Sequence, residues 1–553
     1  KIAYHLAQEA RAGLFEFKLP KDLQDVLFDF QAKAVKIAAN HVNKRRGVVV
    51  GDVVGLGKTM MATALARIFQ DDHSLETLII CPKNLVKMWE DYVHKYRLLA
   101  KILPLSMVTR ELPELRRYRL VVVDESHNLR NREGQRFRAI QEYIKDNESR
   151  VILLTATPYN KTFLDLSSQL RLFIDEHEDI GLRPEQLLKE IGETEFIRRH
   201  QAPLRSLAAF EKSEYTDDWR DLMRFYLVRR TRSFIKDNYA ITDEDNGRQY
   251  LEYQDGSRSY FPDRIPKTLK FTIKTNDPND QYARLYTEDV IDMVNDLMLP
   301  RYGLGNYLID GAEADATPQE KAQMDNLSRA GKRLKGFCRT NLFKRLESCG
   351  KSFIQSIGRH IIRNYIYVHA IENKMPLPIG SLDAEIFDTL TNDEDAESTL
   401  MAQTLLEYSD DDENGDESDN DIVLELYTDE WFRSAAEQTY KVYWDKYKNK
   451  KRFKWIKSEL FDEDLKEHLL SDAQDLMGIL QDNSEWEPKK DAKLKQLRKL
   501  LTEDHPNEKI LIFTQFADTV RYLYQELQDI GSIEAVTGQT DDPTSVAHRF
   551  SPI

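Results

Sequence analysis

VVVGDVVGLGKTMMATALARIF, residues 48–69, consists of a short β-branched strand sequence, a glycine-containing turn and a helical run in direct succession. Three more buried-strand sequences occur within the first 160 residues, namely TLIICP (77–82), LVVVDE (120–125) and VILLTATP (151–158). Short apolar strands that alternate with helical sequence are typical of a parallel sheet with crossover helices. The sequence therefore predicts an α/β fold for this part of the chain.

The pattern changes between about 160 and 485, where strong strand sequences nearly vanish and helical periodicity dominates. LFKRLESCGKSFIQSIGRHIIRNY (342–365) is predicted to form a single helix, and the parallel-sheet pattern returns at KILIFTQF (509–516) and SIEAVTG (532–538). We therefore expect two α/β lobes separated by a mostly helical insertion. The expected parts are an N-terminal helical segment (1–24), lobe one (25–200), the insertion (201–485) and the start of an incomplete lobe two (486–553).

GDVVGLGKT (51–59) lies between the strand VVV and the helix that follows it, which is where a phosphate-binding loop is expected. Small residues let backbone N–H groups approach phosphate oxygens, and the dipole of a helix N-terminus favours anions. The strict pattern needs Gly where this chain has Asp52, which weakens the match taken alone. The residues expected to bind the phosphates are Gly55, Leu56, Gly57, Lys58 and Thr59, with the Thr59 hydroxyl as a Mg²⁺ ligand.

DESH (124–127) comes directly after the strand LVVV, so its acids are expected at the carboxyl edge of the sheet, where ligands bind. Asp124 is expected to hold Mg²⁺ through water, and Glu125 to orient and deprotonate an attacking water. An acidic turn at the end of a strand is common in isolation. Together with the phosphate loop on a neighbouring strand, it indicates a nucleotide-hydrolysing site.

TATP (155–158) ends the fourth strand, and its two hydroxyl residues, Thr155 and Thr157, are candidates to bond to the acidic motif and transmit phosphate loss. A strand that simply ends at a proline is the ordinary interpretation of this segment. The context of the two preceding motifs favours the coupling role.

The net charge of −15 does not exclude a nucleic-acid partner, because the acidity is local. Residues 383–430 hold 19 of the 94 acidic residues and no Lys or Arg, so the rest of the chain carries 79 basic and 75 acidic residues. The centre of this window, SDDDENGDESDND (409–421), repels itself and is predicted to be a disordered loop. Two roles stay open for it: a solubilising insertion, or a mobile DNA mimic.

The order GLGKT, LIICP, DESH and TATP resembles superfamily 2 helicases, and the form DxxGLGKT at 52–59 resembles the Swi/Snf ATPases among them. The resemblance covers about 25–270 and 485–553. FDFQAKAV resembles the glutamine motif of the family and makes Gln31 the expected reader of the adenine edge. Further similar segments are FYLVRRTR (225–232), FPDRIPKT (261–268), KRLESCGKSF (344–353), DAKLKQLRKLL (491–501) and VAHRFSP (546–552).

The resemblance implies two RecA-like lobes, ATP and Mg²⁺ as cofactors, and a motor that moves along double-stranded DNA. It also implies nucleic-acid contacts at Lys83, Asn84, Thr514 and Gln515. The last two family motifs, a GxNLQ-like and a QxxGRxxR-like segment, do not occur before Ile553, so we expect the chain to be truncated there. KRLESCGKSF is similar to bacterial polymerase-recycling relatives, and other bacterial relatives carry a phospholipase-D-like nuclease, so an RNA polymerase or a fused or associated nuclease is a candidate partner.

Two other functions compete with the duplex translocase: a strand-separating helicase on DNA or RNA, and an ATP-controlled DNA-binding scaffold that recruits a nuclease. Three cysteines without a CxxC pair argue against a disulfide framework or zinc site and favour a reducing compartment. The apolar runs are shorter than the ~18 residues of a membrane span, and the start KIAYHLAQEA has no signal-peptide pattern and looks internal. We expect a protein of the bacterial cytosol or nucleoid without a membrane partner.

Overall fold

The computed structural model divides into two compact units, Lys1–Ile265 and Pro266–Ile553. It describes residues 17–52, 55–160, 162–252, 256–262, 265–314, 316–380, 428–447, 453–483, 486–538, 540 and 542–551. Most of the expected N-terminal helical segment and nearly all of the acidic window lie outside these ranges.

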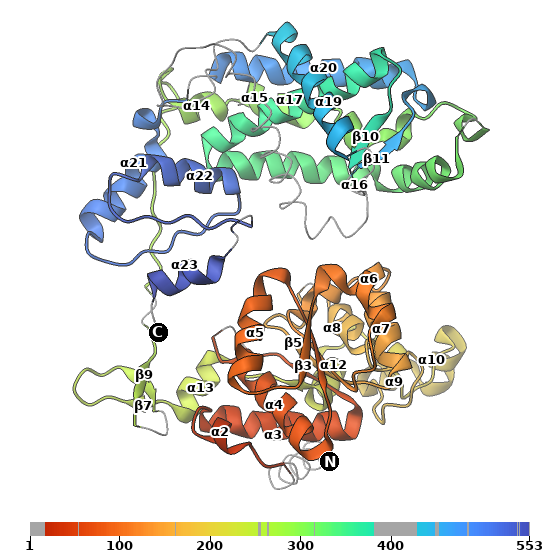
Figure 1. Ribbon diagram of the computed structural model, residues 1–553, viewed down its shortest axis with the longest axis vertical. Helices are drawn as coiled ribbons and strands as arrows, with labels where there is room; N and C mark the ends of the chain where they lie inside the picture. The colour runs from red at the N-terminus through yellow and green to blue at the C-terminus, as the bar shows by residue number, and fades with distance from the viewer. Residues whose placement is uncertain are drawn as a thin grey trace. The chain divides into compact units, whose positions relative to one another are not determined.

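A parallel sheet of six strands forms the centre of the first unit (Figure 1). Four of its strands are those predicted from the sequence, and two short edge strands were not predicted. In spatial order the strands are β3 (Ala100–Pro104), β2 (Thr77–Cys81), β4 (Leu120–Val123), β5 (Arg150–Leu154), β1 (Gly47–Val50) and β6 (Leu227–Val228). The two missed strands lack a strand signal because β6 has only two residues and β3 contains Lys and Pro.

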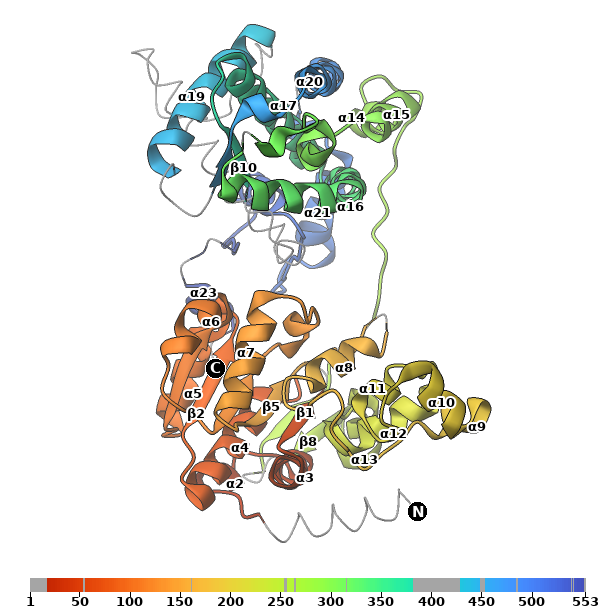
Figure 2. The ribbon, with the colours of Figure 1, turned by 90° about the vertical axis from the view of Figure 1, so that its right-hand side faces the viewer.

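Helices cover both faces of this sheet (Figure 2), which explains why its central strands are apolar throughout. In β1, Val48 and Val50 face one layer and Val49 faces the other, as the two-residue strand period requires. One layer contains α3 (Asp29–Arg45), α4 (Lys58–His73) and α5 (Val86–Lys95); the other contains α6 (Val108–Glu111), α7 (Gln135–Asp146), α8 (Leu164–Leu170) and α12 (Thr216–Tyr226).

Smaller elements complete the first unit. Their bounds are α2 (Lys21–Gln24), α9 (Glu185–Ile191), α10 (Glu193–His200), α11 (Leu207–Phe210) and α13 (Arg232–Tyr239), with an antiparallel sheet of β7 (Ile241–Thr242), β8 (Gln249–Glu252) and β9 (Arg258–Tyr260). α13 and β8 bury Ile235 and Leu251 against Phe30 and Leu56, so they pack on the loop that follows β1.

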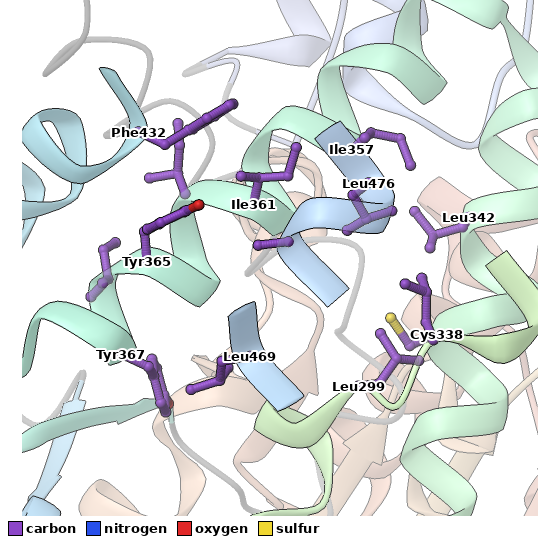
Figure 3. Close-up of a cluster of buried hydrophobic side chains, with 14 of the residues drawn as sticks. Leu299, Cys338, Leu342, Ile357, Ile361, Tyr365, Tyr367, Phe432, Leu469 and Leu476 are labelled. Carbon is purple, nitrogen blue, oxygen red and sulfur yellow. The ribbon is translucent and has the colours of Figure 1, made fainter. Parts of the chain in front are cut away.

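The second unit is mostly helical, as predicted for the insertion, and its core forms around α17 (Figure 3). Ile357, Ile361 and Tyr365 of α17 lie in one apolar cluster with residues of three other long helices. The helices of this unit are α14 (Gln281–Leu285), α15 (Glu288–Asp296), α16 (Pro318–Ser348), α17 (Gly350–Glu372), α19 (Asp429–Tyr447), α20 (Glu463–Asn483), α21 (Ala492–Lys499), α22 (Ala517–Glu526) and α23 (Pro543–Phe550). β10 (Leu377–Gly380) and β11 (Phe453–Ile456) pair antiparallel.

The prediction of a single helix over 342–365 is wrong, because the chain breaks between α16 and α17. Cys349 is extended, with φ −162° and ψ 133°, and caps α17. A side chain at Gly350 would overlap the Trp486 ring, so the break allows a close contact between the start of α17 and a distant segment. Helical periodicity continues on both sides of the break and therefore does not reveal it.

The two segments expected to be strands of lobe two, 509–516 and 532–538, lie outside every strand ladder of the described residues. Phe513 is 89% exposed, and Leu511 and Ile512 are exposed as well. A parallel strand is stable only when neighbouring strands accept its backbone hydrogen bonds. The α/β class, with a parallel-sheet lobe and a mostly helical region, is confirmed, while these two strand predictions are not.

Three further observations concern the described residues alone. None of their helices is long and apolar enough to cross a membrane. They contain no cluster of three or more His, Cys, Asp or Glu side chains suited to a metal. Cys81, Cys338 and Cys349 are buried free thiols.

Candidate nucleotide-binding site

The three motifs meet at one edge of the parallel sheet because β1, β5 and β4 are neighbours and each motif follows the carboxyl end of its strand. GDVVGLGKT follows β1, TATP follows β5 and DESH follows β4. In an open parallel sheet this edge is where ligands bind. Strand order thus brings together residues that are about 100 positions apart in the chain.

Two glycines give the phosphate loop its shape. Gly55 and Gly57 have φ of 85° and 76°, a left-handed conformation that residues with a Cβ rarely adopt. A Cβ at Gly57 would also lie 2.5 Å from the side-chain nitrogen of Gln31. Gly57 caps α4, a helix of 16 residues whose first residue is Lys58, so the loop leads into a helix N-terminus. These features suit a phosphate group.

Asp52, at the position where the general pattern has Gly, is fully buried and binds Arg230. Its Oδ1 accepts the Arg230 backbone N–H at 2.7 Å, and its Oδ2 accepts a guanidinium N–H at 3.0 Å. Burial raises the pKa of Asp52, and the charge of Arg230 opposes that rise. The Asp therefore anchors the FYLVRRTR segment beside the loop, a role that sequence reasoning missed.

The arginines of FYLVRRTR lie against the glutamine motif, the phosphate loop and the residue that follows TATP. The Arg230 guanidinium also donates to the Phe30 carbonyl and lies over the Phe30 ring. Arg229 lies over the ring of Tyr159, next to TATP, and Arg232 lies close to Gly55, 3.2 Å from where a Cβ would be. This segment therefore braces the glutamine motif, the phosphate loop and the residue that follows TATP.

Lys58 lies near both acids of DESH. Burial raises the pKa of Asp124, and the His127 hydrogen bond lowers the pKa of Glu125. The positive charge of Lys58 is a smaller influence that favours the ionised form of both. The ammonium group donates to the Asp52 carbonyl at 3.1 Å. Lys58 begins the helix after β1 and the two acids follow β4, so all three lie at the same sheet edge. Their roles in nucleotide binding stay a prediction.

Asp124 is 6% exposed, and both of its carboxylate oxygens accept hydrogen bonds. Oδ1 accepts the backbone N–H of Glu125 at 2.9 Å, and Oδ2 accepts the indole N–H of Trp89 at 2.9 Å. Burial raises the pKa of Asp124, and the Trp89 hydrogen bond opposes that rise. Trp89 was not predicted, because its position within an amphipathic helix looks like that of a core residue.

Glu125 adopts a left-handed backbone conformation with φ 49°, which is uncommon for a residue with a side chain and often marks a functional site. Its Oε2 pairs with Nδ1 of His127 at 3.1 Å, and the hydrogen bond from His127 lowers the pKa of Glu125 despite partial burial. Glu125 is therefore ionised at neutral pH, as a base that accepts a proton from water must be.

The acidic motif and TATP are joined by side-chain hydrogen bonds. His127, the partner of Glu125, lies 3.3 Å from the Thr155 hydroxyl, which also accepts the backbone N–H of Thr157 at 3.1 Å. Arg130 donates to the Thr157 carbonyl at 2.6 Å. A change at Glu125 can therefore reach TATP through two contacts. The coupling role of Thr155 and Thr157 stays a prediction.

The Gln31 side chain contacts the phosphate loop from α3. Its amide nitrogen donates to the Leu56 carbonyl at 2.9 Å, and its oxygen accepts the backbone N–H of Phe28 at 2.9 Å. The Leu56 side chain is buried, so this residue can offer a ligand only its backbone. Recognition of adenine by Gln31 stays a prediction; the amide keeps one N–H donor and one oxygen lone pair beyond these two bonds.

The four residues predicted to contact nucleic acid fall in different units. Lys83 and Asn84 are exposed in a short 3₁₀ turn, Lys83–Leu85, directly after β2 and thus at the same sheet edge as the motifs. Thr514 and Gln515 lie in the second unit, where Gln515 is exposed and the Thr514 hydroxyl lies 3.1 Å from that of Ser348. Their contacts with nucleic acid stay a prediction.

The residues at the sheet edge fit a magnesium-bound nucleoside triphosphate. The left-handed glycines, the helix N-terminus and Lys58 match the phosphates, while the Asp124 carboxylate and the Thr59 hydroxyl supply the oxygen ligands that Mg²⁺ prefers. A parallel-sheet edge with these residues is typical of phosphate-loop nucleotide hydrolases.

Residues 30–111 match the SNF2-related domain. The chain is similar to the SWI/SNF-related matrix-associated actin-dependent regulator of chromatin subfamily A-like protein 1 of Drosophila melanogaster, with 28% identity over 172 residues. It is also similar to chromodomain-helicase-DNA-binding protein 8 of Danio rerio, with 22% identity over 343 residues. These alignments cover 27% and 55% of this chain, but only 22% and 12% of the two relatives.

A solved structure, the Sulfolobus solfataricus SWI2/SNF2 ATPase core in complex with dsDNA, aligns with 56% of this chain and 63% of its own, at 18% identity and a TM-score of 0.29. The matched domain and the relatives bear out the resemblance seen in the motifs. Residues 30–111 thus belong to an SNF2-related domain, and the chain is similar to Swi/Snf-type ATPases of superfamily 2, which supports an ATP-hydrolysing enzyme.

Proposed function

We propose that the chain is the ATP-hydrolysing part of a motor that translocates along double-stranded DNA. The observation that carries the proposal is the meeting of a phosphate loop, two acids and a pair of threonines at the carboxyl edge of one parallel sheet. Hydrogen bonds from His127 and Arg130 join the acidic motif and the segment after it to TATP, which offers a route from the nucleotide to the rest of the lobe. The names of relatives, which include a DNA annealing helicase and a DNA repair and recombination protein, support DNA as the track.

In the proposed reaction the loop amides and the N-terminus of α4 hold the phosphates, and Lys58 leaves the Asp52 carbonyl to bind the β- and γ-phosphates. Thr59 and Asp124 would hold Mg²⁺, and its charge would offset the negative charge of the phosphates. Glu125 orients the attacking water and accepts its proton. The His127 contact keeps the Glu125 carboxylate in place for this step.

Loss of the γ-phosphate is proposed to change the affinity for DNA through TATP and the 3₁₀ turn Lys83–Leu85 that follows β2. Glu125, His127 and Thr155 form one chain of contacts at the sheet edge, and Lys83 and Asn84 are exposed after the neighbouring strand of β4. The resemblance implies that a second lobe, to which Thr514 and Gln515 belong, binds the same strand and supplies arginines to the γ-phosphate. Alternate closing and opening would then move the protein along the duplex.

A Lys58→Ala variant of the complete protein tests the site. We expect nucleotide binding to weaken and DNA-stimulated ATP hydrolysis to fall to the level of a no-enzyme control. Lys33→Ala is a matched control, since this lysine lies on α3 in the same unit and pairs with the exposed Asp29. Unchanged ATP turnover in the Lys58 variant would show that the site is assigned to the wrong residues.

Two assays on the complete protein separate translocation from the alternatives. A duplex translocase displaces the third strand of a triplex but leaves a forked duplex paired, whereas a strand-separating helicase also separates the fork. An ATP-controlled scaffold does neither, although ATP changes its DNA affinity. Triplex displacement that needs ATP and vanishes in Lys58→Ala supports the proposal.

A further inference from the structure

Trp89 connects the acidic motif DESH to α5, a helix that contains none of the predicted site residues. It lies on α5, is 1% exposed, and donates its indole N–H to Oδ2 of Asp124 at 2.9 Å. The two residues are 35 positions apart, on different elements. A buried tryptophan usually finds a hydrogen-bond partner for its N–H, and here that partner is the carboxylate of Asp124.

The second oxygen of Asp124 accepts the backbone N–H of Glu125, at 2.9 Å. One donor would leave the carboxylate able to rotate about its Cβ–Cγ bond, whereas two donors on different oxygens fix its plane. The carboxylate oxygens keep further lone pairs, because each can accept more than one bond. The site therefore holds this carboxylate in one orientation with capacity left for another partner.

The chemistry of an indole suits this task. It donates one hydrogen bond, carries no charge and cannot accept a bond. A Lys or Arg in its place would neutralise the carboxylate and compete with a cation for it. Ligating side chains in metal sites are commonly oriented by such outer hydrogen bonds, whose removal typically lowers metal affinity by about 10–100-fold.

We propose that Trp89 is a positioning residue that orients Asp124 toward the magnesium ion of bound nucleotide. The proposal rests on the proposed function, because it assigns a role to Asp124 within that site. Trp89 lies on the helix that begins just after Lys83 and Asn84, so a shift of that turn on DNA binding would move the donor that holds Asp124. DNA contact and metal binding would then be coupled through one hydrogen bond.

The test replaces Trp89 by Phe in the complete protein and measures the affinity for a fluorescent ATP analogue as Mg²⁺ is titrated. Phe keeps the aromatic packing and removes the donor. We expect about ten times more Mg²⁺ for half-maximal tightening of nucleotide binding, with unchanged affinity in EDTA. Trp219→Phe is the matched control, since Trp219 is equally buried in the same unit but donates to the Ser213 carbonyl at 2.9 Å.

A second measurement does not depend on the stability of the Phe variant. In wild-type protein labelled with ¹⁵N at the indole, the Trp89 N–H signal should shift when Mg²⁺ is added to the nucleotide complex. The same signal should move in Asp124→Asn without Mg²⁺, which also identifies it. An indole signal that is insensitive to both changes would overturn the proposal.

The outcomes distinguish a failure of the positioning role of Trp89 from a failure of the proposed nucleotide site. Equal Mg²⁺ dependence in wild type, Trp89→Phe and Trp219→Phe, with binding still lost in Lys58→Ala, would refute the positioning role and keep the nucleotide site. Nucleotide binding that survives in Lys58→Ala would refute the site itself. A lower melting temperature for Trp89→Phe with normal Mg²⁺ dependence would assign to Trp89 a purely structural role.

Discussion

Asp52 shows how one residue can depart from a general pattern and still serve the same loop. The phosphate loop of this chain gains a buried carboxylate, and that carboxylate binds Arg230, which is 178 positions away. A charge in this place is stable only because its partner is also buried, with 12% of the Arg230 side chain exposed. Asp52 therefore joins the phosphate loop to the FYLVRRTR segment, and its presence does not disrupt the loop.

Replacing Asp52 by Asn should lower the free energy of unfolding by about 3–5 kcal/mol, because Arg230 would be left buried without its counter-charge. Urea unfolding of the purified variant measures this. The double variant Asp52→Asn/Arg230→Met removes both charges and should recover most of the loss. A double variant as unstable as the single one would contradict this account of the pair.

Replacing Glu125 by Gln should slow ATP hydrolysis by about 10²–10⁴-fold while nucleotide binding is kept. The amide keeps the size of the side chain but cannot accept a proton from water. Single-turnover hydrolysis and binding of a fluorescent nucleotide, measured on the same sample, separate the two effects. Hydrolysis at the wild-type rate would mean that another group is the base.

At the scale of elements, the segment after DESH is fixed to the helices behind the sheet by Glu211. Its carboxylate forms two hydrogen bonds with Arg171, at 2.8 and 2.6 Å, and another with Arg132 at 2.5 Å. Burial, the largest influence, raises the pKa of Glu211, but the hydrogen bonds from Arg171, Arg132 and Ser167 bring it down to about 2. This network holds the chain that leaves the acidic motif.

The Glu211 network should make the stability of the first unit depend on pH. The pKa of Glu211 falls from 4.5 to about 2 on folding, so its contribution is fully present above pH 4.5 and is lost as the pH falls toward 2. At pH 7 the free energy of unfolding of Glu211→Gln should therefore be lower than that of wild type by up to about 3 kcal/mol. Urea unfolding of both proteins measures this difference. The difference should shrink at pH 3. A constant difference between the two pH values would exclude this carboxylate as the cause.

The break between α16 and α17 belongs to the same scale. Gly350→Ala should destabilise the second unit by about 1–3 kcal/mol, because the new methyl group would overlap the Trp486 ring. Thermal unfolding of the variant measures this, and Gly358→Ala, with open space around its Cβ position in α17, is the control. Combining Gly350→Ala with Trp486→Leu should restore part of the loss. Equal effects of the two glycine substitutions would mean that propensity rather than packing decides.

At the scale of the whole molecule, the charge distribution bears on DNA binding. The net charge of −15 is concentrated in 383–430, and the remainder of the chain carries a small basic excess. A motor held mainly by DNA phosphates releases counterions when it binds, so DNA-stimulated hydrolysis should fall steeply between about 50 and 200 mM salt. Hydrolysis without DNA should change little over the same range. A flat response of the DNA-stimulated rate would count against phosphate binding.

The sequence predicted most of the site because its motifs directly follow apolar strands. A parallel sheet places the carboxyl ends of all its strands at one edge, so strand order alone predicts that GLGKT, DESH and TATP meet. Short β-branched runs are local signals, and their order in the chain was sufficient for this. The α/β class and the mostly helical region follow from the same periodicities.

Other features depend on contacts between residues far apart in the chain, and local sequence cannot encode them. The Trp89 indole meets Asp124, and Asp52 meets Arg230, only because the sheet and its covering helices bring four separate segments together. The break at Gly350 is set by the Trp486 ring that packs on it. The sequence by itself determined which chemistry stands at the sheet edge, through patterns of a few adjacent residues. Tertiary structure alone decided which side chains hold that chemistry in place, because hydrogen bonds and packing act through space and not along the chain.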